Sequence, residues 1–283
     1  MIKANPTIFK FYLSMMDSFS EYLSNKYSEA TLDDPNHYKT VIIKKIVRMF
    51  HTLEQLVRET QDEVSARCVL RGILDSVTVF CFIYQREERN EMMFRHYLYI
   101  LDGFKTYKKV FIDGGIGDRI DKLKFGYAYS KVIEQIKMKL SSHPYTKLNN
   151  KNVEEIIKCT RWKYKSLDQQ KKLSFHKMYE QVGYDSSLRD YYQGILSQYA
   201  HGLCISNAQH NNPELLKNVL YESIPIADRM INAICSTFPD KELLLQINRS
   251  KIIKMLVKEP EFNIDDLITF VKALVKKEGI LSI

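Results

Sequence analysis

The sequence predicts an all-α fold, a multi-helix bundle, on the strength of three observations. Glycine and proline are scarce, with 10 and 7 residues among 283, which argues against an all-β fold rich in tight turns. Apolar residues make up 45% of the chain, enough to build a substantial core. Apolar side chains also recur at helical spacing, as at Ile46, Phe50, Leu53 and Val57.

The apolar stripes and their breaks give the order of the helices. Helices are predicted near the N-terminus and then over 41–60, 63–85, 87–112, 119–140, 151–160, 167–182, 187–204, 212–238 and 241–258, with a last one from about Asn263 to Gly279. The clearest loop is 112–118. Gly183 is a helix stop, and Ser186 or Ser187 is the expected cap of the helix that follows it.

Two parts of unequal size are expected. Residues 1–240 form the helical bundle, and residues 241–283 form a small C-terminal helical appendage, because Pro239 and Pro260 bracket the start of that segment. No internal repeat or low-complexity tract divides the chain further.

Several signals point to a soluble protein of the cytoplasm without cofactor. The five cysteines match neither a CxxC pair nor a zinc pattern, so they are expected as reduced thiols. Asp17 and Glu21 interrupt the N-terminal apolar stretch, which therefore predicts a helix and not a signal peptide. No window resembles a membrane span. The histidines lack paired metal-ligand spacing, and GGIG at 114–117 lacks the context of a phosphate loop.

The positive charge of the chain is concentrated in its middle. The net charge is +8, and residues 105–177 hold 18 Lys and Arg against 7 Asp and Glu. A basic segment of this kind suits a polyanion such as RNA or DNA. The alternative is an ordinary solvated lysine-rich surface, which is what charge runs usually form.

Two helices carry polar residues that stand out. Arg71 and Asp75 lie four residues apart in a nearly all-apolar helix and therefore share one face. Burying such a pair costs free energy unless it has partners, so it serves either a function or a structural salt bridge. In the second helix Asp190, Ser197 and His201 lie on one stripe with Gly194, which offers a carboxylate, a hydroxyl and an imidazole. The alternative there is a capping histidine and a hydroxyl bonded to its own helix.

The run from RWKYKSLDQQ to LSQYAHG resembles a bacterial helical family known mainly as a domain of unknown function. The family pattern has a Trp, a short helix ending in Gly, and then Tyr and Ser-x-Tyr-x-His, with Arg-x-x-x-Glu upstream. The matching positions are Trp162, Gly183, Tyr192, Ser197, Tyr199 and His201, with Arg71 upstream. Asp75 stands where the family tends to have Glu. The resemblance covers about residues 40–205 and implies that Arg71, Asp75 and His201 form one site.

A looser resemblance is to HEPN proteins, helical bundles that often act as RNases in toxin and phage-defence systems. Their mark is an Arg followed by a polar residue and, four to six residues on, a His. Arg89, Asn90 and His96 fit this pattern, but a chain with so many Arg and His residues gives roughly one such match by chance. The alternative is an exposed charged face.

These patterns lead to one expected function and one alternative. The expected function is an RNA-directed effector of the HEPN kind, a metal-independent RNase in bacterial phage defence or a toxin system, which self-associates. His201 would act as acid and base, Arg71 would bind phosphate and Asp75 would orient it. The other expected site residues are Ser197 for catalysis and Tyr192, Tyr199 and Trp162 for substrate. The alternative is a non-enzymatic helical binding module or sensor in which the Arg, Asp and His side chains form a structural polar network.

Overall fold

The computed structural model describes residues 6–114, 119–148, 150–167, 172–202 and 213–238. Over these residues the chain is built from α-helices joined by short π-helical and 3-10 turns, and the only β-type pairing is an isolated bridge between Tyr164 and Lys172. The predicted all-α multi-helix bundle is therefore confirmed. Residues 241–283, predicted as a helical appendage, lie outside the described residues.

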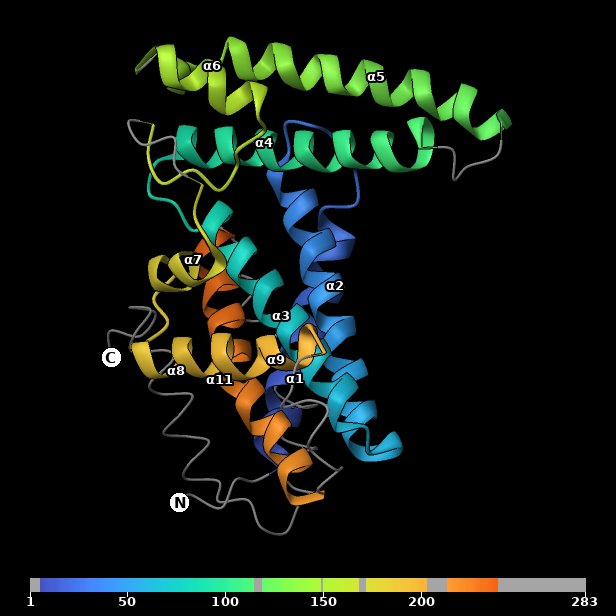
Figure 1. Ribbon diagram of the computed structural model, residues 1–283, viewed down its shortest axis with the longest axis vertical. Helices are drawn as coiled ribbons and strands as arrows, with labels where there is room; N and C mark the ends of the chain where they lie inside the picture. The colour runs from blue at the N-terminus through green and yellow to red at the C-terminus, as the bar shows by residue number, and fades with distance from the viewer. Residues whose placement is uncertain (1–5, 115–118, 149, 168–171, 203–212, 239–283) are drawn as a thin grey trace.

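Four long helices form the main bundle (Figure 1). They are α1 (Pro6–Lys26), α2 (Pro35–Gln55), α3 (Glu63–Tyr84) and α11 (Pro213–Thr237). The π-helical turn η1 (Leu56–Thr60) links α2 to α3. Helix α3 lies at the centre, and its apolar residues are buried on nearly every side, as their sequence predicts.

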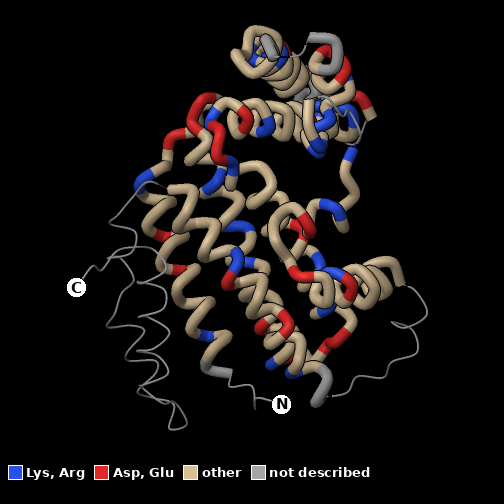
Figure 2. Tube along the Cα trace, turned by 90° about the vertical axis from the view of Figure 1, so that its left-hand side faces the viewer, with Lys and Arg blue, Asp and Glu red and all other residues tan. Residues whose placement is uncertain are grey.

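A second layer lies across one end of this bundle (Figures 1 and 2). It contains α4 (Arg89–Tyr107), the π-helical turn η2 (Lys108–Asp113), α5 (Arg119–Ser141), the 3-10 turn η3 (Pro144–Leu148) and α6 (Asn150–Lys158). Helices α4 and α5 run side by side, and their far ends project beyond the bundle. We call η2 together with the adjoining ends of α4 and α5, residues 104–114 and 119–131, the aromatic arm.

Short helices cover one side of α3. They are α7 (Phe175–Gln181), α8 (Ser186–Tyr191), the π-helical turn η4 (Tyr192–Leu196) and α9 (Ser197–Ala200). Tyr164 and Tyr192, which are fully buried, help to fix this layer. Within the described residues, no helix is both long and apolar enough to cross a bilayer.

Side-chain caps explain where several helices begin. Asp34 accepts a hydrogen bond from the Asn36 amide at the start of α2, and Asp62 accepts one from Ser65 at the start of α3. Asp185, and not Ser186 or Ser187, caps α8 by accepting from the Leu188 amide at 2.9 Å. Its carboxylate is the stronger acceptor, and Ser187 donates to it.

Candidate functional site

Arg71 and Asp75 form the expected pair on α3, but they are not fully buried. Arg71 Nε lies 3.2 Å from Asp75 Oδ2, and the side chains are 15% and 29% exposed. The Tyr179 hydroxyl of α7 donates to Asp75 Oδ1 at 2.5 Å. Arg71 Nη1 donates to the backbone oxygen of Tyr192 at 3.3 Å. The pair thus ties α3 to the short helices that cover it.

Tyr179 is a member of this cluster that the sequence did not indicate. Burial and the neighbouring Asp75 raise the pKa of Tyr179, so the phenol stays protonated and acts as a donor. The Arg71 guanidinium lies over the same ring at 5.5 Å from its centroid. The arrangement satisfies every charge in the cluster.

The stripe of Asp190, Gly194, Ser197 and His201 lies at the surface of the described part of the chain. Asp190, Gly194 and His201 are exposed, and Ser197 is half-buried. The helix there contains the π-helical turn η4, whose wider turns shift the register between α8 and α9. A Cβ added at Gly194 would have no described atom within 4 Å, so this glycine does not mark a close approach.

The buried face of the same segment carries the tyrosines. Tyr192 is fully buried, and its hydroxyl donates to the Glu222 backbone oxygen at 2.9 Å. Tyr199 is 3% exposed, and its backbone oxygen accepts from Cys68. Both rings therefore pack in the interior, where a substrate would have to displace core contacts.

The structure brings the two predicted helices together, but through other residues than expected. Among the described residues, neither Arg71 nor Asp75 hydrogen-bonds with Ser197 or His201. The α9 segment instead contacts Arg67, which lies one turn before Arg71. The guanidinium of Arg67 lies 5.1 Å from the centroid of the Tyr199 ring. A site that joins His201 to Arg71 stays a prediction.

Arg67 is the centre of a buried network that the sequence analysis missed. Its Nε lies 2.9 Å from Glu63 Oε1, and its Nη1 lies 2.9 Å from Glu222 Oε2 and donates to the Tyr191 hydroxyl at 3.0 Å. The Tyr199 hydroxyl donates to Glu63. We call these five residues the Arg67 network. The available signal was the spacing of Glu63 and Arg67, four residues apart in the same all-apolar helix as Arg71 and Asp75.

Trp162 lies apart from this network, in the connection that leads from α6 to α7. Its side chain is 8% exposed, and its indole N–H donates to Asp102 Oδ2 at 3.2 Å. The buried Arg95 donates to the backbone oxygens of Trp162 and Tyr164 at 3.3 and 3.0 Å. Trp162 therefore fixes the connection against α4.

The members of the HEPN-type triplet differ in burial. His96 is fully buried, whereas Arg89 and Asn90 are exposed at the start of α4. The Tyr84 hydroxyl and His96 Nδ1 hydrogen-bond at 3.0 Å, and burial lowers the pKa of His96 to about 4. Within the described residues an imidazole so enclosed has no route to a substrate, because its place is set by core packing.

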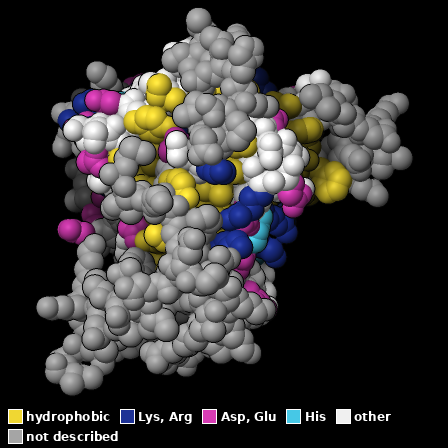
Figure 3. All heavy atoms as spheres, turned by 90° about the horizontal axis from the view of Figure 1, so that it is seen from below, with side chains coloured by type: hydrophobic (Ala, Val, Ile, Leu, Met, Phe, Trp, Pro, Cys, Tyr) yellow, Lys and Arg dark blue, Asp and Glu magenta, His cyan; other side chains and the backbone are white. Residues whose placement is uncertain are grey.

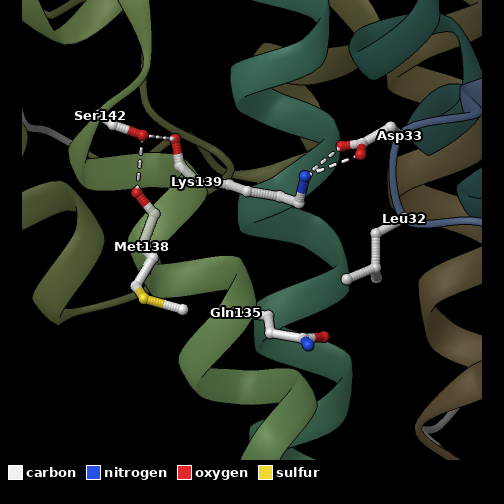
Figure 4. Close-up of a pocket in the computed structure, with 6 residues that line it drawn as sticks. All are labelled: Leu32, Asp33, Gln135, Met138, Lys139 and Ser142. Atoms are coloured by element: carbon white, nitrogen blue, oxygen red, sulfur yellow. Dashed lines mark hydrogen bonds and ion pairs between the residues drawn. The ribbon is translucent and has the colours of Figure 1, made fainter.

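Neither of two hollows on the described surface contains a predicted site residue. The larger, about 450 Å³, lies between α5 and the connection before α2. Lys139 points across it to both carboxylate oxygens of Asp33, each at 2.7 Å (Figure 4). Asp33 also accepts a hydrogen bond from Tyr97 of α4. The contacts around this hollow therefore connect the second layer to the segment that precedes α2. The smaller hollow, about 330 Å³, lies on α2.

The aromatic arm is the surface where the basic middle segment meets exposed rings. Tyr107 is 44% exposed, Phe111 41%, Phe125 51% and Tyr127 75%. Tyr107 stacks on Phe111 with centroids 4.4 Å apart, and on Tyr129 with centroids 4.9 Å apart. Aromatic residues at helical spacing usually belong to the core, which holds for Phe94 and Tyr97 of α4 but not for these rings.

Comparison with known proteins adds no relative: no family model matches the chain, and no curated protein or solved structure is significantly similar to it. In the described part of the chain, no group of three or more His, Cys, Asp or Glu side chains is arranged to hold a metal ion. The function is therefore inferred from the geometry of the surfaces described above.

Proposed function

We propose that this protein binds single-stranded nucleic acid, with RNA as the case that the sequence predicts, and that the aromatic arm holds the bases. The observation that carries the proposal is the stack of Phe111, Tyr107 and Tyr129 at the protein surface. Aromatic rings on a basic surface are the means by which proteins hold unpaired bases, because every base has a face that stacks.

The geometry of the stack supports this role. The rings of Tyr107 and Tyr129 are nearly parallel, with 14° between their planes, and those of Tyr107 and Phe111 make 29°. Phe111 lies at one end of the stack and is 41% exposed. A base that continues the stack would cover apolar ring surface that now faces solvent, and such stacking contributes about 1–3 kcal/mol per base.

The charges of the arm suit a phosphate backbone. The residues of the arm, 104–114 and 119–131, include seven Lys and Arg against two Asp and Glu. Lys109 and Lys131 are exposed, and neither forms an ion pair with another described residue. Partial burial and then the nearby Lys137 lower the pKa of Lys105. A phosphate placed among these cations would relieve their repulsion.

The geometry supports binding better than cleavage. Cleavage as expected from the sequence needs Arg71 and His201 at one phosphate. The described hydrogen bonds of Arg71 go to Asp75 and to the Tyr192 backbone, and the imidazole of His96 is enclosed in the core. The RNA-directed part of the prediction is therefore retained, and the acid and base roles are left for a direct test.

The experiment compares ring-removing and ring-keeping variants of the arm. Fluorescence anisotropy with labelled oligo-uridine, oligo-thymidine and duplex RNA would be measured for the wild type, for Tyr107→Leu with Phe111→Leu, and for Tyr107→Phe with Phe111→Tyr. We expect the single strands to bind and the Leu variant to lose about tenfold to a hundredfold in affinity, while the ring-keeping variant changes by less than about twofold.

Two results would overturn the proposal. One is a wild type that does not bind single strands at low salt. The other is a Leu variant that binds as tightly as the ring-keeping one. Tighter binding of duplex than of single strands would show that binding depends on phosphate charge and not on the stacking of unpaired bases. The uridine and thymidine arms separate RNA from DNA, which present the same ring faces and phosphates.

A further inference from the structure

The outer face of α2 carries a group of cations that the proposed function does not yet use. Lys44, Lys45 and Arg48 line the smaller hollow, of about 330 Å³, together with Val41, Met49 and Thr52. The three cations are exposed. They lie three or four residues apart along the helix, except for the adjacent lysines, and so they share one face.

The group has no acidic partner among the described residues. The side chains of the three cations form no ion pair or hydrogen bond with another described residue. Two acids of this region have other partners, since Glu54 of α2 lies 2.8 Å from Arg58 and Asp17 of α1 lies 2.8 Å from His51. Like charges three or four apart destabilise a helix slightly. A face that keeps them without an acid is suited to an anion from outside.

The shape of the hollow suits one unit of a strand. Its volume of about 330 Å³ is near the lower end of the range for ligand sites. Val41 is 52% exposed, so the hollow offers an apolar wall beside the charges. Arg48 can grip a phosphate with two parallel hydrogen bonds, and the lysines act as point charges.

The position of α2 relates this face to the arm. Helix α2 runs away from the second layer, so its outer side lies below the projecting ends of α4 and α5 (Figure 1). Figure 3 shows Lys and Arg side chains gathered around a His on the face seen from below, with acidic and hydrophobic side chains beside them. A strand that extends from the arm along α2 would meet the exposed cations of this helix.

We infer that Lys44, Lys45 and Arg48 bind the phosphodiester backbone of the same strand whose bases stack on the aromatic arm. This inference rests on the proposed function and adds a second contact to it. The arm holds bases through ring faces, and the α2 face holds backbone through charge. Neutralising phosphates releases counterions and stacking does not, so the cations of the α2 face should add to the salt dependence that the lysines of the arm give.

The test uses a triple variant and a control with the same loss of charge. The variant is Lys44→Gln, Lys45→Gln, Arg48→Gln. The control is Lys158→Gln, Lys165→Gln, Lys172→Gln, three exposed cations at the end of α6 and on the connection from α6 to α7. Affinity for oligo-uridine of about 4 to about 16 nucleotides is measured against salt concentration. A plot of log affinity against log salt concentration has a negative slope. For the long strand we expect this slope to become shallower by about 2 in the variant, and by clearly less in the control.

A readout on the wild type guards against an unfolded variant. Lysine acetylation followed by mass spectrometry should show that the long strand protects Lys44 and Lys45, whereas the short strand, held by the arm, does not. Lys158 and Lys172 should acetylate equally in both cases. A poly-glutamate peptide of similar charge should protect the two α2 lysines much less than the strand does.

The outcomes separate the two proposals. If the ring-removing variant loses affinity but the triple variant and its control have equal slopes, the α2 inference is wrong and the proposed function stands. If the triple variant loses affinity and the ring-removing one does not, the arm is wrong and the α2 face is the binding site. Equal protection by poly-glutamate overturns the assignment to a nucleic acid backbone. A wild type that binds no strand overturns both.

Discussion

The Arg67 network and the aromatic arm contain the same kinds of side chain but use them in opposite ways. In the network the side chain of Arg67 is 6% exposed and meets two carboxylates. In the arm the rings of Tyr107 and Phe111 are partly exposed, and Lys109 and Lys131 form no ion pair with a described residue, although Lys108 pairs with Asp113. Groups that satisfy one another internally contribute to stability, and groups left unsatisfied at the surface are available to a ligand. Composition alone does not distinguish the two cases.

The largest expected effect is the loss of Arg67. Arg67→Met leaves Glu63, 2% exposed, and Glu222 without their cation, and breaking a buried pair in this way costs about 3–5 kcal/mol. The matched control is Arg58→Met, because Arg58 pairs with Glu54 at the same spacing and at 2.8 Å, but with 36% of its side chain exposed. That change should cost less than about 1 kcal/mol. Urea denaturation of both variants measures the difference, and equal losses would mean that burial does not separate the pairs.

A second large effect concerns pH and His96. Burial lowers the pKa of this residue to about 4, below the unfolded value of about 6.5. Between about pH 4 and about pH 6.5, the unfolded chain therefore binds a proton at His96 and the folded chain does not. His96 should leave stability unchanged above about pH 6.5 and reduce it by about 3 kcal/mol as the pH falls to about 4.

The measurement for His96 is the free energy of unfolding against pH in the wild type and in His96→Gln. Glutamine keeps an acceptor for the Tyr84 hydroxyl but does not titrate. The variant is expected to be less stable at neutral pH and to show a shallower fall between about pH 6.5 and pH 4. Parallel profiles would mean that His96 is solvated or moves on protonation.

A smaller loss is expected at Asp75. Asp75→Ala removes the acceptor of the Tyr179 hydroxyl and the ion pair of Arg71. Because Arg71 is 15% exposed and keeps its bond to the Tyr192 backbone, the cost should be about 1–3 kcal/mol, less than at Arg67. Thermal melts beside Asp190→Ala, whose side chain is 75% exposed, give the comparison. A melt of Asp75→Ala equal to that of wild type would mean that solvent replaces both contacts.

The helices were largely predictable because their patterns are local. The apolar run over 63–85 matches α3 (Glu63–Tyr84), and the break at Gly183, which has a φ of +84°, ends the α7 region as predicted. The predicted helix over 187–204 is in fact divided by a π-helical turn. Such a turn has no strong sequence signal, and it rotates the side chains that follow it.

The site was less predictable because its partners are distant in sequence. Arg67 and Glu222 are 155 residues apart, and Tyr179 and Asp75 are 104 apart, so spacing along the chain does not reveal either contact. Periodicity identified which face of α3 carries charge, but not which arginine the covering helices meet. Likewise, the aromatic residues of α4 look alike in sequence. Tyr97 is buried because the middle of α4 packs on the bundle. Tyr107 is exposed because it is the last residue of α4, and this end of the helix projects beyond the bundle.

The smallest effect on stability is expected at His201, where the comparison between buried and exposed groups is sharpest. His201 is exposed at the end of α9, and its backbone amide donates to the Ser197 backbone oxygen at 3.1 Å. His201→Ala should therefore change the free energy of unfolding by less than about 0.5 kcal/mol. Binding of single strands should also stay within about twofold of wild type, because the bases stack on the arm.

This variant also decides between binding and cleavage. Labelled RNA is incubated with wild type and with His201→Ala, and its length is followed on a gel while affinity is measured in parallel. We expect the RNA to stay intact with both proteins. If the wild type cleaves it and the variant binds equally but does not cleave, His201 is the acid or base that the sequence predicts. An exposed imidazole would then have to meet Arg71 in the bound state, and a role limited to binding would be wrong.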